Sequence, residues 1–540
     1  MGTKHRRPEE NGEAATPIQQ VAQQPRQWAP GLGAGTMIAH ERRMIHEAGR
    51  SGPSARRHAA YLAALFIVCS TAAACSAGRA PDAPIALPLR AVSGRDLFVV
   101  PNPHNALSSV VTFDARGFDS ARVVYWAANE PRRATPFSRR PGVGRIVTLG
   151  LRPETPYFHV LERVRGRDVV TSDTVQVTTG RLPEYIRRAH MRMTGTPTSG
   201  YVLTSMVDTG RTGFVVAFDS TGQLRWYREF PGELPPGETK QQPNGDFTVF
   251  LGRTPGWMLF PGAYEQFRPS GEVVRTFTAP PPLYTDNHEL LLTFRDTVFD
   301  AAHFFSYEGR PGDLSRWGGP RDTLIFGHQL LRVGADGIPH TVLDGWKHFN
   351  WDDRIEPPRD TLYDFDHPNS LDFDHDGNYI VSYRNMGEIT KIDARSGAII
   401  WRFGGRNNQF AIRNDPLNGF SAQHSVRVLD NGNLLVYDNG TRHTPQETRA
   451  VEYRLDTAAK TADMVWEYRH TPPLFVPFTG SVQRLKGGNT VIGYSNRGLV
   501  TEVDPKGVVV WEGTVMVNPD KAGDFYRAIK IASLYRYERP

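Results

Sequence analysis

Three histidines stand at the starts of strand-like segments that could bring them together. His288 lies in TDNHELL, His367 opens HPNSLDF, and His424 lies in QHSVRV. Asn369 stands two residues after His367, so the two share a face in a strand, and Arg384 ends the next strand-like run. Imidazoles in such a cluster can bind a metal ion. Alternatively, a histidine nitrogen can attack an anionic substrate that the arginine and asparagine hold.

The last two of these histidines belong to a phrase that the sequence repeats three times, at 367–401, 423–466 and 479–511. Each copy has a polar opening, an alternating strand, a Gly-Asn turn, a second strand, a third strand that ends in Asp, and a Trp. Four short strands repeated at this period are typical of the blades of a β-propeller. The asparagines that mark the turns are Asn378, Asn433 and Asn489.

Weaker copies of the phrase lie upstream, at 200–227, 240–277 and 286–345. With them, the sequence predicts an all-β fold with a six-bladed β-propeller at 185–515; the alternative is a set of unrelated hairpins. A propeller places the opening residues of its blades around one axis, so we expect the polar openings to converge. The residues that we expect to contact a substrate there are Asn369, Gln423, Asn439 and Thr479. Acidic residues near the histidines, Asp286 and Asp366, are candidates to bind a metal or to orient imidazoles.

Two segments flank the predicted propeller. Residues 84–181 consist of strand-like runs separated by turns, which predicts a small β-sandwich of the fibronectin-III or Ig-like kind. The phrase LRPETPYFHVL resembles a tyrosine corner, in which the Tyr157 hydroxyl would bond to nearby backbone. Residues 516–540 are predicted to form a short amphipathic helix followed by a tail.

The first 75 residues have the character of a leader. Residues 1–58 lack apolar periodicity and are predicted to be disordered or to follow a start codon placed too early. Residues 59–75 form an apolar run behind an Arg-Arg-His flank, as in a secretory signal peptide. The run ends in AAAC, which favours a lipobox with lipidation at Cys75; the alternative is a signal peptide that is cleaved without lipidation. We therefore expect export to the cell envelope and a lipid anchor on the periplasmic or extracellular face of a membrane.

Charge and cysteine content exclude several classes. The net charge of +6 lies mostly in the leader, whose first 75 residues contribute about +4, so the rest has no nucleic-acid footprint. Cys69 and Cys75 are the only cysteines. The exported protein is thus expected to have no internal disulfide, no cysteine nucleophile and no cysteine metal ligand. The sequence carries no signal for an oligomeric state.

Several motifs resemble the bacterial arylsulfotransferase (aryl-sulfate sulfotransferase) family. They are WRFGGRNNQF, SAQHSVRVLDNGNLLVYDNG, GSVQRLKGGNTVIG, and HPNSLDF followed by SYRN. Over roughly 185–535 the resemblance implies a six-bladed propeller behind a β-sandwich. It also implies transfer of a sulfuryl group from a phenolic sulfate to a phenol, with no nucleotide sulfate donor, no metal and no cofactor.

The resemblance also implies roles for individual residues. His424 matches the histidine that becomes transiently sulfated, in a ping-pong mechanism. His367, Asn369 and Arg384 match the residues that bind the sulfuryl group and handle protons, as do His288 and Thr479, whose surroundings differ more. Well-studied members carry a disulfide near the site, which this chain cannot form, so the resemblance is to a divergent branch.

Two other functions fit the same residues. One is a propeller that binds a polyanion or a partner without turnover. The other is a metal-dependent hydrolase or lyase that holds a divalent ion between His288, His367 and His424.

Overall fold

The computed structural model describes residues 92–93, 96–139, 142–207, 213–230, 236–252 and 262–537. All of them belong to one unit, Leu87–Pro540. The predictions about the leader, the signal segment and Cys75 concern residues outside the described ones. Nearly all regular structure is strand, which confirms the predicted all-β class. None of the described helices is long and apolar enough to cross a membrane.

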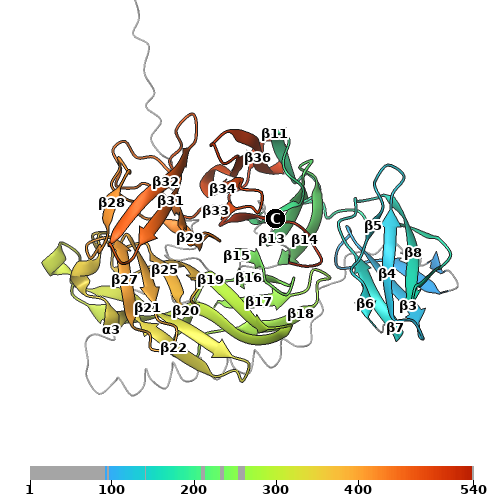
Figure 1. Ribbon diagram of the computed structural model, residues 1–540, viewed down its shortest axis with the longest axis horizontal. Helices are drawn as coiled ribbons and strands as arrows, with labels where there is room; N and C mark the ends of the chain where they lie inside the picture. Colours follow the sequence, from blue (N-terminus) through green and yellow to red (C-terminus); the bar gives the residue numbers. More distant parts are fainter. Residues whose placement is uncertain are drawn as a thin grey trace, which may run out of the picture. The chain divides into compact units, whose positions relative to one another are not determined.

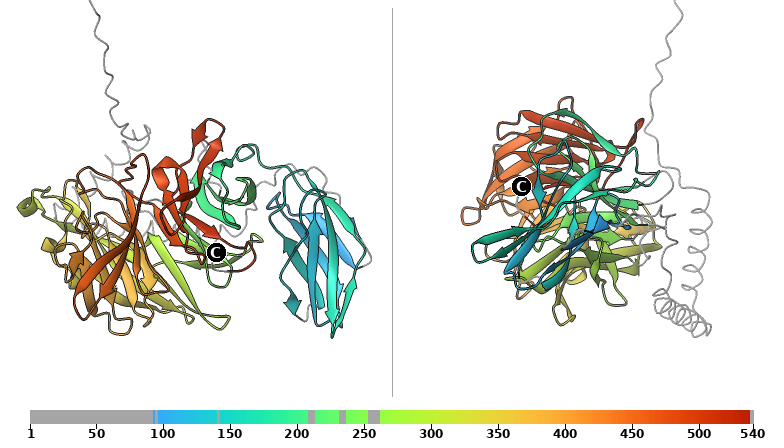
Figure 2. Two further views of the ribbon diagram at one scale, coloured as in Figure 1. Left: turned by 45° about the horizontal axis from the view of Figure 1, so that its top comes forward. Right: turned by 90° about the vertical axis from the view of Figure 1, so that its right-hand side faces the viewer.

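Two antiparallel sheets form the part of the chain up to Thr178, drawn in blue and cyan in Figure 2. Alternate side chains of the long strand β8 are buried, because successive residues of a strand point to opposite faces. Val111 of β3 and Leu161 of β8 belong to one core, so the two sheets pack face to face. The first sheet contains β1 (Val92–Ser93), β2 (Leu97–Pro101), β3 (Ser109–Ala115) and β7 (Gly142–Thr148). The second contains β10 (Val175–Thr178), β8 (Pro156–Arg165), β4 (Ser120–Trp126) and β5 (Arg133–Ala134), with β6 (Ser138–Arg139) on β4 and β9 (Asp168–Thr171) on β8.

The hydrogen bond predicted for Tyr157 is present. Its hydroxyl accepts a hydrogen bond from the backbone N–H of Arg152 at 3.1 Å and donates one to Oε2 of Glu130 at 2.5 Å. Burial and the neighbouring carboxylate raise the pKa of Tyr157 to about 12. The hydroxyl therefore keeps its proton and holds this corner of the second sheet.

Six further sheets follow between His190 and Ile531, each built on four antiparallel strands (Figure 1). The first sheet of this set takes its innermost strand from the end of the chain. It contains β38 (Ala528–Ile531), β12 (Tyr201–Val207), β13 (Gly213–Asp219) and β14 (Leu224–Phe230). The second contains β15 (Pro236–Gln241), β16 (Phe247–Leu251), β17 (Ala263–Phe267) and β18 (Val273–Phe277). The third contains β19 (Tyr284–Arg295), β20 (Val298–Gly312), β21 (Thr323–Gly334) and β22 (Pro339–Asp344), with β23 (Leu362–Asp364) parallel to β21.

The fourth to sixth sheets correspond to the three clear copies of the repeated phrase. The fourth contains β24 (Pro368–Phe373), β25 (Tyr379–Tyr383), β26 (Glu388–Ile392) and β27 (Ile399–Gly404). The fifth contains β29 (His424–Val428), β30 (Leu434–Asp438), β31 (Arg449–Asp456) and β32 (Thr461–Arg469), with β28 (Ala411–Arg413) on β32. The sixth contains β33 (Ser481–Arg484), β34 (Thr490–Tyr494), β35 (Leu499–Val503) and β36 (Val509–Asn518), with β11 (His190–Gly195) and β37 (Lys521–Ala522) on β36. The short helices are α3 (Gly345–His348), η2 (Ser315–Trp317), η3 (Trp351–Asp353) and η4 (Ser495–Arg497).

One turn closes the first hairpin of each of these three sheets, as the Gly-Asn signal predicted. In the fourth sheet the N–H of Gly377 donates to the carbonyl of Asp374, and the N–H of Asp374 donates to the carbonyl of Asn378. The same pair of hydrogen bonds recurs in the fifth and sixth sheets. The turn needs a left-handed residue, a conformation that glycine adopts without steric cost. Its glycines have φ of 80°, 81° and 92° at Gly377, Gly432 and Gly488.

The sheets form a closed ring. One hydrophobic core lies between each sheet and the next, and another joins the sixth sheet at Trp511 to the first at Phe214. The innermost strands are neighbours in the order β15, β19, β24, β29, β33 and β38. Sheets arranged radially around a common axis are the arrangement of a β-propeller.

The helix predicted within residues 516–540 is wrong. β36 extends to Asn518, β37 follows it, and β38 pairs with Tyr201–Thr204 of β12. The local pattern of apolar residues fits both states, but pairing with β12 fills the inner edge of the first sheet and satisfies the backbone of both strands. The ring therefore runs beyond the predicted limit of residue 515.

Candidate active site

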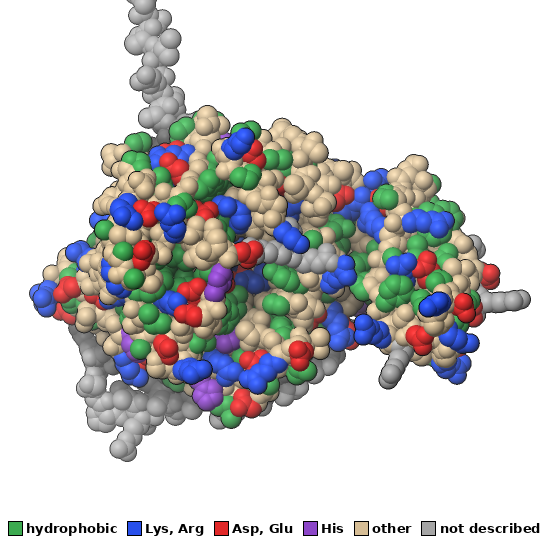
Figure 3. Space-filling model, viewed as in Figure 1, with side chains coloured by type: hydrophobic (Ala, Val, Ile, Leu, Met, Phe, Trp, Pro, Cys, Tyr) green, Lys and Arg blue, Asp and Glu red, His purple; other side chains and the backbone are tan. Residues whose placement is uncertain are grey.

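The structure brings the three predicted histidines together from three sheets. His288 lies in β19, His367 directly precedes β24, and His424 begins β29. The ring centroid of His367 lies 4.7 Å from that of His288 and 6.5 Å from that of His424. Figure 3 shows histidine side chains beside a hollow in the middle of the face of the molecule that it presents.

Hydrogen bonds fix which nitrogen of His424 carries the proton. Nδ1 lies 2.7 Å from Oδ1 of Asn439 and 3.0 Å from the carbonyl oxygen of Ala422. Since both neighbours are acceptors, Nδ1 holds the hydrogen. The amide orientation of Asn439 is itself fixed, because its Nδ2 donates to the carbonyls of Val476 and Thr479 at 2.8 and 3.0 Å. Nε2 of His424 therefore presents a lone pair, which accepts a long 3.3 Å hydrogen bond from the N–H of Thr479.

His424 is also held in its neutral form. Its side chain is buried, and burial together with the positive charge of Arg384 puts the pKa of His424 well below its ordinary value. A neutral imidazole with an available nitrogen lone pair can act as a nucleophile or a metal ligand.

His367 pairs with a carboxylate. Its Nδ1 lies 2.6 Å from Oδ2 of Asp364, so Nε2 is the nitrogen that remains for a substrate. Burial and the charges of His288 and Arg384 lower the pKa of His367 more than Asp364 raises it. The imidazole therefore favours its neutral form, which can accept a proton. Its φ of 51° is uncommon for a residue other than glycine.

His288 has a similar partner in its own strand. Its Nδ1 lies 2.8 and 3.0 Å from the two carboxylate oxygens of Asp286, and its backbone N–H donates to Oδ1 of Asp286 at 2.9 Å. The ring of Tyr526 lies 6.1 Å away between centroids. Asp286 thus orients an imidazole, one of the two uses predicted for it. Asp364, which was not predicted from the sequence, orients a second one.

Arg384 supplies a positive charge beside these rings. It follows β25, and its N–H donates to the carbonyl of His367 at 2.9 Å. Its guanidinium donates to Oδ1 of Asn385 at 2.7 Å and reaches the carbonyl of Pro477 at 3.5 Å. None of the described carboxylates forms an ion pair with it. The charge of Arg384 is therefore available to an anionic ligand.

The other predicted contact residues divide into two kinds. Thr479 offers its N–H to the site, and the neighbouring Phe478 is 51% exposed. Gln423 is buried and donates through Nε2 to Ser382, Tyr383 and Glu388, so its amide braces the fourth and fifth sheets. Asn439 positions His424, as described above. Asn369 is buried, and its Nδ2 donates to the carbonyl of Gln423 at 2.7 Å.

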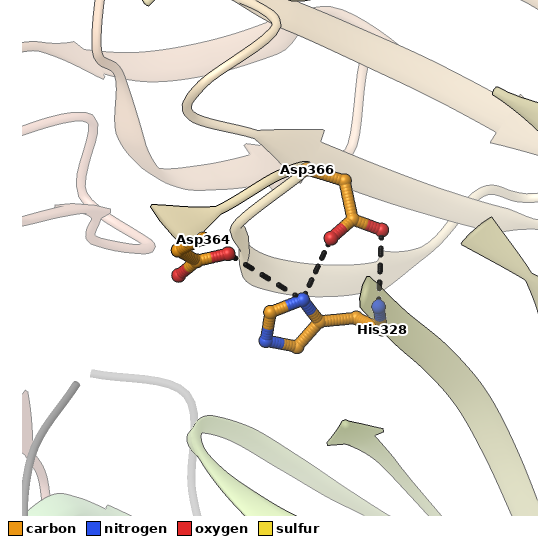
Figure 4. A group of neighbouring side chains, drawn as sticks. All are labelled: His328, Asp364 and Asp366. Carbon is orange, nitrogen blue, oxygen red and sulfur yellow. Dashed lines mark hydrogen bonds and ion pairs between the residues drawn. The ribbon is translucent and has the colours of Figure 1, made fainter. Parts of the chain in front are cut away.

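One candidate functional residue, His328, was not predicted from the sequence. His328 of β21 lies between the carboxylates of Asp286, Asp364 and Asp366. Figure 4 shows the contacts of His328 with Asp364 and Asp366. Its Nδ1 lies 2.7 Å from Oδ1 of Asp366 and 3.6 Å from Oδ1 of Asp364, and its Nε2 lies 3.5 Å from Oδ2 of Asp286. His328 stands within the ordinary strand pattern IFGHQLL, which carries no signal for a site.

A second buried charge cluster lies on the inner strands. Glu289 of β19 accepts from Lys240 of β15, from Arg427 of β29 at 3.0 Å and from Arg527 at 2.7 Å. Arg527 also donates to the carbonyl of Asn369 at 2.7 Å, which connects this cluster to the strand that carries the site. Sequence periodicity cannot reveal the cluster, because its members come from four different parts of the chain.

The metal hypothesis placed an ion between His288, His367 and His424. Among the described residues, the group whose ligand atoms lie within 4.8 Å of one another is instead His328, Asp364 and Asp366. The predicted triad does not meet that criterion, and the Nδ1 atoms of its three rings are already paired with Asp286, Asp364 and Asn439.

Comparisons with solved structures give distant similarities. A protein of unknown function from Bacteroides caccae is 12% identical with a TM-score of 0.37, over 63% of this chain and 98% of its own. A catalytically inactive virginiamycin B lyase from Staphylococcus aureus, determined with quinupristin, is 9% identical with a TM-score of 0.30, over 59% and 86%. The comparison with curated proteins gave no match.

The comparison with protein families gave a specific result. Residues 350–516 match the model of the arylsulfotransferase (ASST) family. This segment contains every predicted site residue of the ring except His288. Over residues 350–516, the chain is therefore similar to the arylsulfotransferase family.

Proposed function

We propose that this protein transfers a sulfuryl group from a phenolic sulfate to a phenol through a sulfo-histidine at His424, without a nucleotide sulfate. The observation that carries the proposal is the state of His424: Asn439 holds the hydrogen on Nδ1, and Nε2 presents a lone pair near the unpaired charge of Arg384. We further propose that the six sheets are the blades of a six-bladed propeller, and that the two preceding sheets form a fibronectin-III or Ig-like sandwich.

The first half of the reaction forms a covalent intermediate. Nε2 of His424 attacks sulfur, an N–S bond forms, and the bond between sulfur and the aryl oxygen breaks. A sulfate monoester is anionic, so attack requires that its charge be compensated. Arg384 supplies that charge, and the N–H of Thr479 turns from Nε2 to a sulfuryl oxygen. Asn369 adds the second N–H of its amide.

The second half returns the group to an acceptor. The aryloxide leaves, and an acceptor phenol takes its place. His367, neutral and oriented by Asp364, accepts the phenol proton as the phenol oxygen attacks sulfur. The N–S bond breaks and His424 is restored. His288, 4.7 Å away between centroids, passes the phenol proton from His367 to solvent, where it neutralises the released aryloxide, so that His367 is neutral for the next turnover. Two displacements in sequence predict ping-pong kinetics.

Aryl substrates require an apolar contact. Phe478 is 51% exposed and directly precedes Thr479, so its ring can stack on the aryl group of the donor or acceptor. Four other aromatics near this face, Trp346, Phe349, Trp351 and Phe365, pack in the core between the third and fourth sheets. These four side chains therefore contribute to the stability of the fold and not to substrate binding.

The test uses the full chain, a chromogenic aryl sulfate and added phenol. We expect release beyond the first equivalent of chromophore to depend on the phenol, and a sulfo group on His424 when the donor is supplied alone. His424→Ala should abolish both, whereas the matched control His443→Ala, which removes a histidine paired with Asp438, should retain both. Continued release without phenol, beyond one equivalent per enzyme, would mean a sulfatase. An adduct on another residue would overturn the assignment, and the absence of release would favour a binding protein.

Export remains part of the proposal. The Arg56-Arg57-His58 flank, the apolar run and Cys75 support a lipoprotein of the cell envelope. Mass spectrometry of the membrane fraction should find a mature protein that begins at a lipidated Cys75. An unmodified N-terminus upstream of residue 59 would contradict export, and a free Ser76 would indicate cleavage without an anchor.

A further inference from the structure

The inference concerns His328, which the proposed mechanism does not use. Its side chain is 1% exposed, and so is that of Asp286; Asp366 is fully buried. Nδ1 faces carboxylate oxygens of Asp366 and Asp364 (Figure 4). Nδ1 carries the hydrogen that it donates to Asp366 at 2.7 Å. Nε2 makes no hydrogen bond with a described residue and lies 3.5 Å from Oδ2 of Asp286, where a lone pair would face a negative oxygen and a hydrogen is favoured instead. The ring is therefore an imidazolium.

Buried charge supports the same protonation state. Burial opposes a charge on His328, but Asp366, Asp364 and Asp286 outweigh it and hold its pKa well above the ordinary value. Without the imidazolium, three buried carboxylates would face one another, and an uncompensated buried charge costs several kcal/mol. The fold therefore contains a buried positive charge, carried by the protonated ring of His328, beside the carboxylates of the site.

A metal ion fits the same atoms less well. Zinc bound at about 2.0–2.1 Å by two ligands in tetrahedral geometry separates the ligand atoms by roughly 3.3 Å. Nδ1 of His328 and Oδ1 of Asp366 are 2.7 Å apart. That separation is typical of a charge-assisted N–H···O hydrogen bond.

The carboxylates around His328 are the ones that orient the site. Asp286 accepts from Nδ1 of His288, and Asp364 accepts from Nδ1 of His367. Asp366 accepts from the backbone N–H of both His328 and His367. One buried ring thus touches the partner of each proton-carrying histidine.

We propose that His328 is a positioning residue, whose imidazolium bridges Asp286, Asp364 and Asp366 and thereby keeps His288 and His367 oriented and ready to accept protons. The proposal rests on the proposed function for its effect on transfer, and on the geometry for the protonation states. The titratable groups that face His328 are Asp286 from β19, Tyr307 from β20, Asp364 from β23, and Asp366.

The test removes one charge and then its partner. His328→Gln deletes a positive charge, so the remaining carboxylates draw a proton onto His367, whose pKa should rise by about one unit or more. The acidic limb of the pH–rate profile should move to higher pH by the same amount. Asp366→Asn deletes a negative charge and should move the limb to lower pH. The double variant restores the charge balance and should return the limb toward its wild-type position.

His303→Gln is the matched control. His303 is a buried histidine of β20 that bonds to Tyr379 and Thr293 but touches no carboxylate of the site. It should lose stability and leave the acidic limb in place. A purely structural His328 would behave in the same way, and that result would overturn the proposal.

The protonation state of His328 can also be measured without an activity assay. NMR of histidine-labelled full-length protein should show both nitrogens of His328 protonated through neutral pH, and His367 shifting in His328→Gln. A neutral His328 in the wild type, or a metal ion retained by the purified protein at this site, would overturn the proposal. If the wild type transfers no sulfuryl group, the proposed function fails, whereas the NMR titrations still decide the role of His328.

Discussion

The backbone N–H of Thr479 lies 3.3 Å from Nε2 of His424, although the two residues are 55 positions apart and open different sheets. Asn439 makes this relationship possible, because its side chain bonds both the ring of His424 and the carbonyl of Thr479. The imidazole of His424 and the N–H donor beside it are therefore positioned by one amide. Thr479 has a φ of 59°, a conformation that this anchoring helps to hold.

Loss of that amide should lower catalysis strongly. Asn439→Ala removes the acceptor that keeps the hydrogen on Nδ1 of His424, and it frees the loop at Thr479. We expect kcat to fall by about 10²–10⁴-fold, as when an imidazole loses the partner that sets its tautomer. Asn433→Ala is the control, because Asn433 donates a hydrogen bond to Glu452 in the same sheet and does not contact the imidazole of His424. Equal losses in both variants would show that the bond to the imidazole has no special role.

Replacement of His367 should separate the two half-reactions. A good leaving group departs from an aryl sulfate as an aryloxide and needs no proton. The acceptor phenol, in contrast, must lose its proton before or as it attacks sulfur. His367→Gln should therefore keep the first burst of chromophore release and lower steady-state turnover by about 10²–10⁴-fold. Rapid-mixing measurements of burst and turnover give both rates. A lost burst with unchanged turnover of the preformed sulfo-enzyme would place His367 in the first step instead.

The site was predictable where its residues belong to the local repeat. The Gly-Asn turns fix the register of the fourth to sixth sheets, and register places His367, Asn369, Arg384 and His424 at one end of the ring. Gln423 shows the limit of this reasoning: it shares the polar opening of its repeat, but its amide faces the neighbouring sheet. The alternation of apolar and polar residues predicts the strand. The direction of a side chain at the end of that strand depends on packing between sheets, which the alternation does not contain.

Long-range pairing explains what the sequence did not predict. The carbonyl of Arg527 accepts a hydrogen bond from Thr204, 323 positions away, just before β38 enters the first sheet. No local pattern contains that pairing, so the final segment looks like an amphipathic helix. His328 is similar, because its meaning depends on three carboxylates from other strands.

Acid should destabilise the protein through its buried neutral histidines. Burial lowers the pKa of His303 to about 4. A folded-state pKa below the unfolded value of about 6.5 means that its stability is complete above pH 6.5 and is lost as the pH falls toward 4. The loss amounts to about 3 kcal/mol for such a shift. His303→Gln should therefore show a smaller decrease in urea midpoint than the wild type between pH 7 and pH 5; parallel decreases would contradict this source of acid sensitivity.

The buried cluster around Glu289 should dominate stability at the centre of the ring. Glu289 is fully buried and is the shared acceptor for Lys240, Arg427 and Arg527. Glu289→Gln keeps the shape but leaves Lys240 and Arg527 with Glu238 as their carboxylate partner, at 3.3 and 3.5 Å, and removes the ion pair of Arg427. Breaking a buried pair from one side costs roughly 3–5 kcal/mol, because a charge is left without compensation inside the fold.

The matched control is Glu272→Gln, which breaks an exposed pair with Arg268 on the rim of the second sheet. An exposed ion pair contributes about 0–1 kcal/mol, so this variant should unfold at nearly the wild-type urea concentration. The Glu289→Gln variant should unfold at a clearly lower concentration. Lys240 provides a second readout: burial, with the nearby charges of Arg427 and Arg527, already lowers its pKa to about 7. Loss of Glu289 should lower that pKa further, so Lys240 should react faster with an amine reagent at neutral pH. Equal unfolding midpoints for the two variants, with unchanged Lys240 reactivity, would show that the cations do not depend on Glu289.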